Sequence, residues 1–280
     1  MLQIVTDSSI DLPEGWREAF EINVIPVSIR FGERDYLQDV DLGYDEFFRL
    51  VRETGQFPKT SLPSIGQFVE FYENIAHPND VVLSIHLSSK LSGTYDTAVS
   101  AANALEGQHK VIPFDTRSGS AAMAFMCREA RLMDRAGADL QDILARLEEI
   151  RENQQILLTL DTLEFAHRSG RINALTAALA SVLRMKAIIV LKDGMLEMAE
   201  RVRTRHRALD RLVQMAHQRA GSRALNVAVV HSCDLDTGRA LLDRVRHELN
   251  CQEVLLTELS ISVAAHLGPG TVGVVFYPVD

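Results

Sequence analysis

The N-terminal half of the chain alternates between short apolar runs and longer amphipathic stretches. The short runs have the length and composition of buried strands; they are Leu2–Val5, Asn23–Phe31, Val81–Ile85 and Lys110–Phe114. The longer stretches have the apolar spacing of helices; they are Tyr44–Thr54, Ser64–Ala76, Thr97–Leu105 and Leu140–Asn153. Ser64 and Gln67 stand at the spacing of a capping box. This alternation predicts an α/β domain with a largely parallel sheet.

The pattern changes after about residue 155. Strand-like runs follow at Ile156–Leu160, Leu225–Val230, Val254–Leu259 and Thr271–Tyr277, and helical patterns at Asn173–Leu183, Arg207–Arg219 and Thr237–Asn250. Between Ala187 and Arg203, Asp193-Gly194 separates two strand-like runs and favours a tight hairpin turn. We therefore expect two domains, residues 1–155 and residues 156–280, the second an α+β domain with a mixed sheet.

Composition and charge narrow the class of protein. The 280 residues are 46% hydrophobic and 24% charged, which is typical of a globular protein with a substantial core. The formal net charge of −9 disfavours nucleic acid as a partner, because phosphate contacts need clustered Lys and Arg. The basic stretch Arg201–Arg207 is interpreted as a solvated strand end and helix start, with a docking patch for an acidic partner as the alternative.

The cysteines and the N-terminal sequence indicate the cellular compartment of the protein. Cys127, Cys233 and Cys251 lie far apart and lack C-x-x-C spacing, so no metal or redox motif is indicated. A sparse, odd number of cysteines suits a reducing compartment. No signal peptide and no run of about 18 apolar residues is present. We expect a cytoplasmic protein with no membrane segment and no metal site.

A hydroxyl-rich loop, residues 88–94, follows the strand-like run Val81–Ile85 and precedes a predicted helix. The first amides of a helix have no partner within the helix, and the helix dipole favours an anion there. Ser92 and Thr94 add hydroxyl donors, and Gly93 lies between them. No Gly-Lys-Ser/Thr follows, so the loop is not a P-loop. The alternative is ordinary helix capping.

Other polar clusters occur near predicted strand ends or helix starts, where loops of α/β sheets bind ligands; they are Thr6–Ser9, Lys59–Ser64, Asp115–Ser120, His167–Arg171 and Ala264–Gly270. Thr60 and Ser61 supply hydroxyls. Asp7 is either a nucleophile or metal ligand, or, as the favoured alternative, a cap of a helix or turn. His266 is expected in a Gly-Pro-Gly turn, where Gly268 and Gly270 would let the backbone approach a ligand.

Together these clusters hold many hydroxyls, an arginine and a histidine, but few acids. Ser92, His266 and Asp7 can be combined as a Ser–His–Asp set, so a phosphatase or acyl hydrolase using Asp7 or Ser92 with His266 is one hypothesis. No Gly-x-Ser-x-Gly elbow is present. Donor groups without an evident base or metal fit a binder of carboxylate or phosphate better.

The chain resembles the DegV family in an ordered set of motifs that runs from the first strand to the last; they are Val5–Ser9, Lys59–Ser64, Leu91–Tyr95, Phe114–Thr116, Gly170–Ile172 and His266–Gly270. The family consists of bacterial fatty-acid-binding proteins, some of which are the acyl-carrying subunit of a two-component fatty-acid kinase. One variation is that the family's usual glycine pair before Arg171 is Ser169-Gly170 here.

The resemblance implies a two-domain binding protein, not an enzyme by itself, with the lipid between the domains. It implies no cofactor, a long-chain fatty acid such as palmitate, stearate or oleate as ligand, and a kinase subunit that supplies ATP as partner. The tail would enter an apolar tunnel in the C-terminal domain, with Ile172–Leu183 as a wall. The ligand-binding residues carried over are Thr60, Ser61, Ser92, Gly93, Thr94, Arg171, His266 and Gly268.

Overall fold

The computed structural model describes residues 1–173 and 185–279. The chain divides into two compact units. Unit 1 comprises Met1–Arg151 together with Ser260–Ser262, and unit 2 comprises Glu152–Leu259 together with Val263–Asp280.

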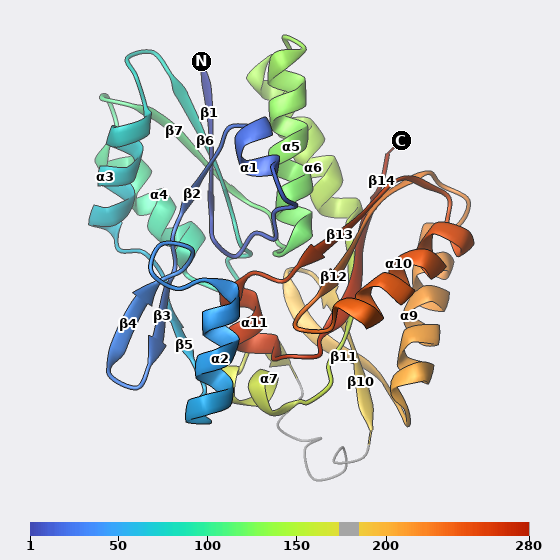
Figure 1. Cartoon of the computed structure of the whole chain (residues 1–280). Coiled ribbons are helices and arrows are strands. Elements are labelled where there is room, and N and C mark those ends of the chain that lie inside the picture. The colour runs from blue at the N-terminus through green and yellow to red at the C-terminus, as the bar shows by residue number, and fades with distance from the viewer. Residues whose placement is uncertain (174–184, 280) are drawn as a thin grey trace. The chain divides into compact units, whose positions relative to one another are not determined.

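A four-stranded parallel sheet forms the centre of unit 1, in the order β2-β1-β6-β7 (Figure 1). The strands are β1 (Leu2–Asp7), β2 (Ile22–Ile25), β6 (Val81–His86) and β7 (Lys110–Asp115). Ile4, Val82 and Leu83 are fully buried, as expected for a parallel sheet covered on both faces. Because the strands are parallel, the loops that follow β1, β6 and β7 leave the sheet at the same edge.

Helices cover this sheet on both faces (Figure 1). On one face α3 (Ile65–Ile75) packs against α4 (Thr94–Ala104), and on the other α5 (Ala121–Arg135) packs against β1. The capping box predicted at Ser64 and Gln67 is confirmed, since each side chain bonds to the backbone of the other residue. The remaining helices of unit 1 are α1 (Trp16–Ala19), α2 (Tyr44–Thr54) and α6 (Leu140–Asn153).

The single tryptophan of the chain packs in unit 1. The ring of Trp16 lies edge-on to Phe20, with ring centroids 5.2 Å apart, and to Phe125 of α5 at 6.2 Å. The guanidinium of Arg128 lies 4.9 Å from the centre of the indole. These contacts hold α1 against α5 through aromatic and cation–π interactions.

The predicted strand Asn23–Phe31 is wrong, because Pro26 divides it. Ile22–Ile25 belongs to the parallel sheet, whereas β3 (Ser28–Phe31) lies in a separate three-stranded antiparallel sheet, in the order β4-β3-β5. Proline has no amide hydrogen and disfavours a continuous ladder, so the chain changes sheets at this residue. The other strands of the small sheet are β4 (Arg34–Leu37) and β5 (Lys59–Ser61).

Unit 2 contains a seven-stranded mixed sheet in the order β13-β12-β14-β8-β10-β11-β9. The strands are β8 (Gln155–Thr159), β9 (Ile172–Asn173), β10 (Lys186–Lys192), β11 (Met195–Val202), β12 (Leu225–His231), β13 (Cys251–Glu258) and β14 (Val272–Pro278). The pairs β12–β13 and β11–β9 are parallel, and the other pairs are antiparallel. The predicted hairpin at Asp193-Gly194 is confirmed as the turn between β10 and β11.

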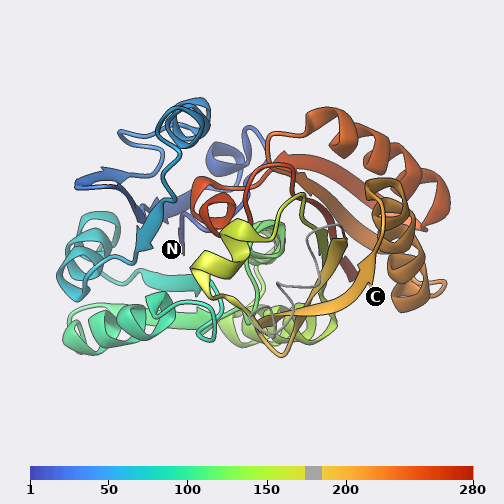
Figure 2. The ribbon, with the colours of Figure 1, turned by 90° about the horizontal axis from the view of Figure 1, so that it is seen from below.

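Two long helices, α9 (Arg205–Ala220) and α10 (Leu235–Glu248), pack together on one side of this sheet (Figure 2). Leu212, Val245 and Phe276 belong to the core between these helices and the strands. Unit 2 also contains α7 (Glu164–Ser169) and the part of α11 (Ile261–Leu267) that follows Ser262. The α/β fold class, with a parallel sheet in the N-terminal part and a mixed sheet in the C-terminal part, is therefore confirmed.

The basic stretch Arg201–Arg207 spans the end of β11 and the start of α9, as predicted. Thr204 caps α9 by accepting a hydrogen bond from the amide of Arg207. Residues 174–183 of the predicted helix Asn173–Leu183 lie outside the described residues. Its first residue, Asn173, belongs to the short strand β9 (Ile172–Asn173).

Candidate functional site

The loop after β6 gathers hydroxyl groups at the start of α4. The Oγ of Ser92 lies 2.8 Å from the Oγ1 of Thr94, and the amide of Thr94 donates to Ser92 Oγ at 3.3 Å. Gly93 is the residue before α4, and no side chain caps this helix. The two hydroxyls therefore lie at the positive end of the helix dipole without acting as its N-cap, which favours an anion at this position.

Thr60 and Ser61 lie in β5, a short strand, rather than in the loop that the sequence indicated. Thr60 is half-buried opposite Ile29 of β3, and Ser61 is exposed. The next residue, Leu62, touches the Ser92 loop: a Cβ placed on Gly93 would lie 3.3 Å from Leu62 Cδ2. Unit 1 thus brings two of the predicted hydroxyl segments side by side.

The remaining candidates lie in unit 2. Arg171 is exposed and follows Gly170, which ends α7 with a φ of +68°. His266 occupies the last turn of the helix α11, so its predicted position in a Gly-Pro-Gly turn is wrong. The turn begins at Gly268, whose φ is +83°, a value that glycine adopts without the strain another residue would meet.

The loop after α11 has a fixed shape. The hydroxyl of Thr271 donates to the carbonyl oxygens of Leu267 and Gly268, at 3.1 and 3.0 Å. A Cβ on Gly268 would lie 2.7 Å from Cδ2 of the buried Phe165 ring. Glycine at this position therefore lets the loop pass close to α7.

His266 is uncharged at neutral pH in this structure. Burial, and next the positive charge of Arg171, lower its pKa to about 4. A neutral imidazole offers a hydrogen bond to a ligand, whereas Arg171 supplies positive charge.

The pKa of His266 makes unit 2 sensitive to acid. Because the folded state holds the histidine neutral, the unfolded state binds the proton more readily between pH 6.5 and 4. Acidification through this range is expected to remove up to about 3 kcal/mol of stability. In His266→Gln this part of the pH dependence should disappear, which urea unfolding of the two proteins at pH 7 and pH 4.5 would show. Equal losses in both would contradict the assignment.

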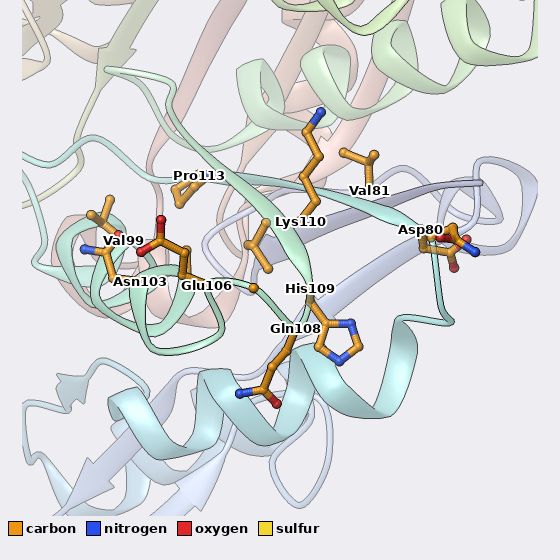
Figure 3. Close-up of a pocket in the computed structure, with 13 residues that line it drawn as sticks. Asp80, Val81, Val99, Asn103, Glu106, Gln108, His109, Lys110 and Pro113 are labelled. Carbon is orange, nitrogen blue, oxygen red and sulfur yellow. The ribbon is translucent and has the colours of Figure 1, made fainter.

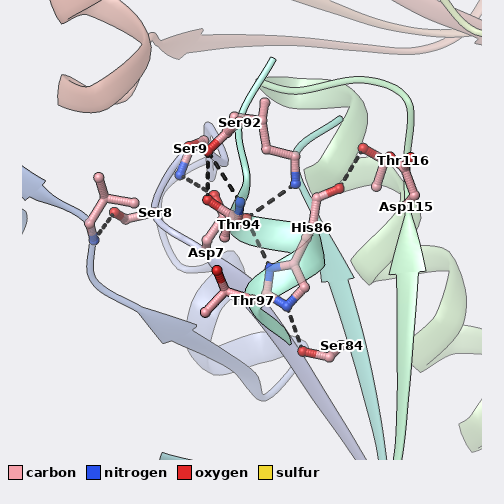
Figure 4. Close-up of polar contacts among 12 residues, drawn as sticks. Asp7, Ser8, Ser9, Ser84, His86, Ser92, Thr94, Thr97, Asp115 and Thr116 are labelled. Atoms are coloured by element: carbon pink, nitrogen blue, oxygen red, sulfur yellow. Dashed lines mark hydrogen bonds and ion pairs between the residues drawn. The ribbon is translucent and has the colours of Figure 1, made fainter. Parts of the chain in front are cut away.

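A buried chain of hydrogen bonds lies beneath the Ser92 loop (Figure 4). Asp7 Oδ2 lies 2.9 Å from His86 Nδ1, and His86 Nε2 lies 2.6 Å from Ser84 Oγ. The hydroxyl of Tyr72 completes the chain, 2.8 Å from Ser84 Oγ. All four side chains are fully buried. The chain is satisfied if Tyr72 donates to Ser84, Ser84 to Nε2, and Nδ1–H to Asp7.

This order of groups is that of a Ser–His–Asp triad, but it lies inside the core. Ser84 and Asp7 have no exposed surface, so neither can reach a substrate. The histidine that bonds to Asp7 is His86, not the His266 of the hydrolase hypothesis. Ser92 bonds to Thr94. Asp7 is therefore too deeply buried to act as the nucleophile of the hydrolase hypothesis.

The cluster after β7 braces the Ser92 loop. Asp115 accepts hydrogen bonds from the amide and the hydroxyl of Ser89, at 3.2 and 2.6 Å. Ser120, which precedes α5, has a φ of +61° and donates its hydroxyl to the buried Asp11. Asp11 also accepts from the amide of Ser260 at 2.7 Å. Burial raises the pKa of Asp11 to about 7, against the smaller opposing effect of these hydrogen bonds.

A cavity of about 680 Å³ in unit 1 lies away from these residues (Figure 3). It is lined by the amino ends of β6 and β7, including Val81 and Lys110, and by the α4–β7 connection, including Glu106 and His109. The hydroxyl-rich loops that follow β1, β6 and β7 leave the sheet at its opposite, carboxyl edge. None of the predicted ligand residues lines this cavity.

Across residues 1–173 and 185–279, no group of three His, Cys, Asp or Glu side chains is arranged to hold a metal ion. In the same ranges, no helix has both the length and the apolar composition needed to cross a bilayer.

His86 and Asp11 are among the residues of these clusters that were not selected from the sequence. His86 ends an apolar run, and its partner Asp7 lies on the neighbouring strand β1. The alternation of Ser84 and His86 on one face of β6 was the available signal. Asp11 had no such signal, because its partner Ser260 is 249 positions away.

Comparisons with known proteins agree with this architecture. A family profile described as an uncharacterised protein of the DegV family matches residues 1–279. A DegV domain-containing protein of Halalkalibacterium halodurans is 33% identical over 278 residues, which cover 99% of this chain and 98% of the relative.

Two solved structures are similar over nearly their whole length. A DegV family protein of Thermus thermophilus, described by its fatty acid binding, has a TM-score of 0.92 and 33% identity, with 99% of each chain covered. DegV of Bacillus subtilis, described as a fatty acid binding protein, has a TM-score of 0.89 and 28% identity, with 99% of each chain covered.

The fold therefore places this chain in the structural class of these two proteins. The match over residues 1–279 and the identity to its relatives show that the chain belongs to the DegV family. The resemblance inferred from the ordered motifs is confirmed.

Proposed function

We propose that this protein binds a long-chain fatty acid. The observation that carries the proposal is the hydroxyl pair of Ser92 and Thr94 at the start of α4, in a chain 33% identical to a structure described by its fatty acid binding. In this proposal the ligand's carboxylate accepts hydrogen bonds from these hydroxyls, and from Thr60 or Ser61. The backbone at Gly93 lies close enough for the same anion to meet the helix N-terminus.

Arg171 and His266 complete the proposed head-group site. The guanidinium supplies charge, and the neutral imidazole supplies a hydrogen bond. Gly268 contributes through its backbone, because its left-handed conformation shapes the loop after α11.

The acyl tail supplies most of the proposed affinity. Burial of a saturated chain gains about 0.8 kcal/mol per CH₂, or on the order of 10 kcal/mol for a 16-carbon tail before ordering costs. The proposal places the tail in an apolar tunnel of unit 2. Its predicted wall, Ile172–Leu183, lies mainly outside the described residues.

We further propose that the protein presents its ligand to a partner kinase. In that reaction a carboxylate oxygen attacks the γ-phosphorus of ATP, ADP leaves, and an acyl phosphate forms. The sequence holds no P-loop lysine motif, so ATP would be bound by the partner. The role of this chain is then to fix the carboxylate at an accessible position while the tail stays out of water.

A mass measurement tests the proposal directly. After expression in bacteria, native mass spectrometry is expected to show a co-purified fatty acid, and added oleate should raise the Tm of delipidated protein. In Ser92→Ala the Kd for oleate should rise about 10- to 100-fold, because a hydrogen bond to a charged group is lost.

Ser100→Ala is the matched control. Ser100 is an exposed serine of α4, the helix that follows the Ser92 loop, and its hydroxyl donates to the carbonyl of Asp96. Its loss should leave the affinity unchanged. A preparation without fatty acid whose Tm ignores oleate would contradict the proposal, and ester hydrolysis that Ser92→Ala abolishes would favour the hydrolase hypothesis.

A further inference from the structure

The carboxylate of Asp7 joins two segments beneath the proposed head-group site (Figure 4). One oxygen, Oδ2, accepts from the amide of Leu87 at 3.1 Å and faces His86 Nδ1 at 2.9 Å. The other, Oδ1, accepts from the amide of Ser9 at 3.0 Å. Leu87 is the residue at which the chain leaves β6. The carboxylate therefore fixes the point where the Ser92 loop begins.

Backbone hydrogen bonds link the position of Leu87 to that of Ser92. The amide of Ser88 donates to the carbonyl of Ser118 at 2.8 Å. The carbonyl of Ser88 then accepts from the amides of Leu91 and Ser92, at 2.9 and 3.1 Å. A displacement of Leu87 would move Ser88 and, through this turn, the hydroxyl of Ser92.

The hydrogen bond from His86 helps to keep the Asp7 carboxylate ionised. Burial alone would raise the pKa of Asp7, but the hydrogen bond from His86 and those from the amides of Leu87 and Ser9 outweigh burial, so this pKa lies below its usual value. An ionised carboxylate only accepts hydrogen bonds. A protonated one would turn an O–H toward donors that need an acceptor.

We propose that His86 is a positioning residue for the bound carboxylate: through its hydrogen bond to Asp7 it fixes the start of the loop that carries Ser92. The inference rests on the proposed function, because the group that His86 would position is the hydroxyl of Ser92, which the proposed function assigns to ligand binding. His86 itself is fully buried and touches no ligand.

Three titratable side chains influence or respond to the Asp7 carboxylate, each from a different element. They are His86 of β6, Tyr72 of α3 and Cys127 of α5. Burial and the charge of Asp7 raise the pKa of Tyr72 and of Cys127, so both stay neutral at physiological pH. Tyr72 bonds to Ser84, which leaves His86 as the member of this group that bonds to Asp7.

Two substitutions separate the two bonds that His86 makes. The amide nitrogen of asparagine reaches the position of Nδ1 and can donate to Asp7, and the amide oxygen of glutamine reaches the position of Nε2 and can accept from Ser84. His86→Asn therefore keeps the bond to Asp7 and loses Ser84, whereas His86→Gln keeps Ser84 and loses Asp7. Both remove the imidazole ring that packs edge-on to Phe68, so the two variants lose similar packing.

The test measures oleate affinity and amide hydrogen exchange in both variants. In His86→Gln the Kd is expected to rise about 10-fold at pH 7 and further as the pH falls to 6, because one hydrogen bond is lost and Asp7 becomes easier to protonate. His86→Asn should bind nearly as the unsubstituted protein does. The amide of Leu87 should exchange faster in the glutamine variant than in the asparagine variant.

The outcomes distinguish this inference from the proposed function. If the unsubstituted protein does not bind oleate, the proposed function fails, whatever the variants do. If it binds and the two variants have equal affinity and equal Leu87 exchange, the role of His86 is overturned. Should the glutamine variant not fold, Asp7→Ala and Ser84→Ala replace the pair. The first removes the carboxylate that accepts from the amide of Leu87 and should weaken binding, whereas the second should not.

Discussion

Gly268→Ala is expected to destabilise unit 2 by about 2–5 kcal/mol. A φ of +83° costs an alanine about 1–2 kcal/mol. The new Cβ would also lie 2.7 Å from Cδ2 and 2.9 Å from Cγ of Phe165, a ring that is buried and cannot withdraw into solvent. Such overpacking costs about 1–3 kcal/mol more. Urea unfolding followed by circular dichroism would measure the change.

Gly170→Ala separates the two contributions. Gly170 also has a left-handed backbone, with a φ of +68°, and no atom of the described residues lies within 4 Å of the position its Cβ would take. Its replacement should therefore cost only the backbone term of about 1–2 kcal/mol. Equal losses at Gly170 and Gly268 would show that the ring of Phe165 moves aside freely. We also expect Gly268→Ala to weaken oleate binding, because the substitution would displace the loop after α11.

Asp11→Asn should remove a large pH dependence from unit 1. Asp11 is 1% exposed, and burial raises its pKa from 3.8 to about 7. The folded state therefore binds a proton more readily than the unfolded state does. Stability from this group is fully present below about pH 4 and is lost as the pH rises through 7. The total loss is about 4 kcal/mol.

Asparagine keeps the size of the side chain and stays neutral. Its oxygen can still accept from the amide of Ser260, and its nitrogen can donate to the hydroxyl of Ser120. Between pH 5 and pH 8 the variant should gain about 3 kcal/mol relative to the unsubstituted protein. The comparison at each pH cancels the titration of all other groups. A difference that is the same at both pH values would contradict the raised pKa.

Local sequence signals predicted most of the regular structure. The capping box at Ser64 and the turn at Asp193-Gly194 have local physical causes, and both were found. The strand assigned to Asn23–Phe31 was wrong because the effect of Pro26 depends on where each half finds a partner, in β1 or in β4. His266 was placed in a turn because glycines dominate its neighbourhood, whereas the helix ends one residue later, at Leu267.

The candidate site was only partly accessible to sequence reasoning. The hydroxyl-rich loops after β1, β6 and β7 could be found because each follows an apolar run, and the carboxyl ends of the strands of a parallel sheet share one edge. The bond between Asp7 and His86 depends on the register of β1 against β6, which the sequence does not specify. For the same reason the family motifs included Asp7, Thr60 and Ser92 but not His86, the buried partner of Asp7.

The position of Trp16 makes indole fluorescence a reporter of unit 1. The chain has one tryptophan, and its ring contacts Phe20, Phe125 and Arg128, all in the same unit. Loss of these contacts on unfolding changes the polarity around the indole, whereas events confined to unit 2 leave it untouched. Emission recorded on one sample therefore follows unit 1 alone, whereas circular dichroism follows the helices and strands of both units. Coincident transitions would mean that the two units unfold as one cooperative block, and separate transitions would give each its own midpoint.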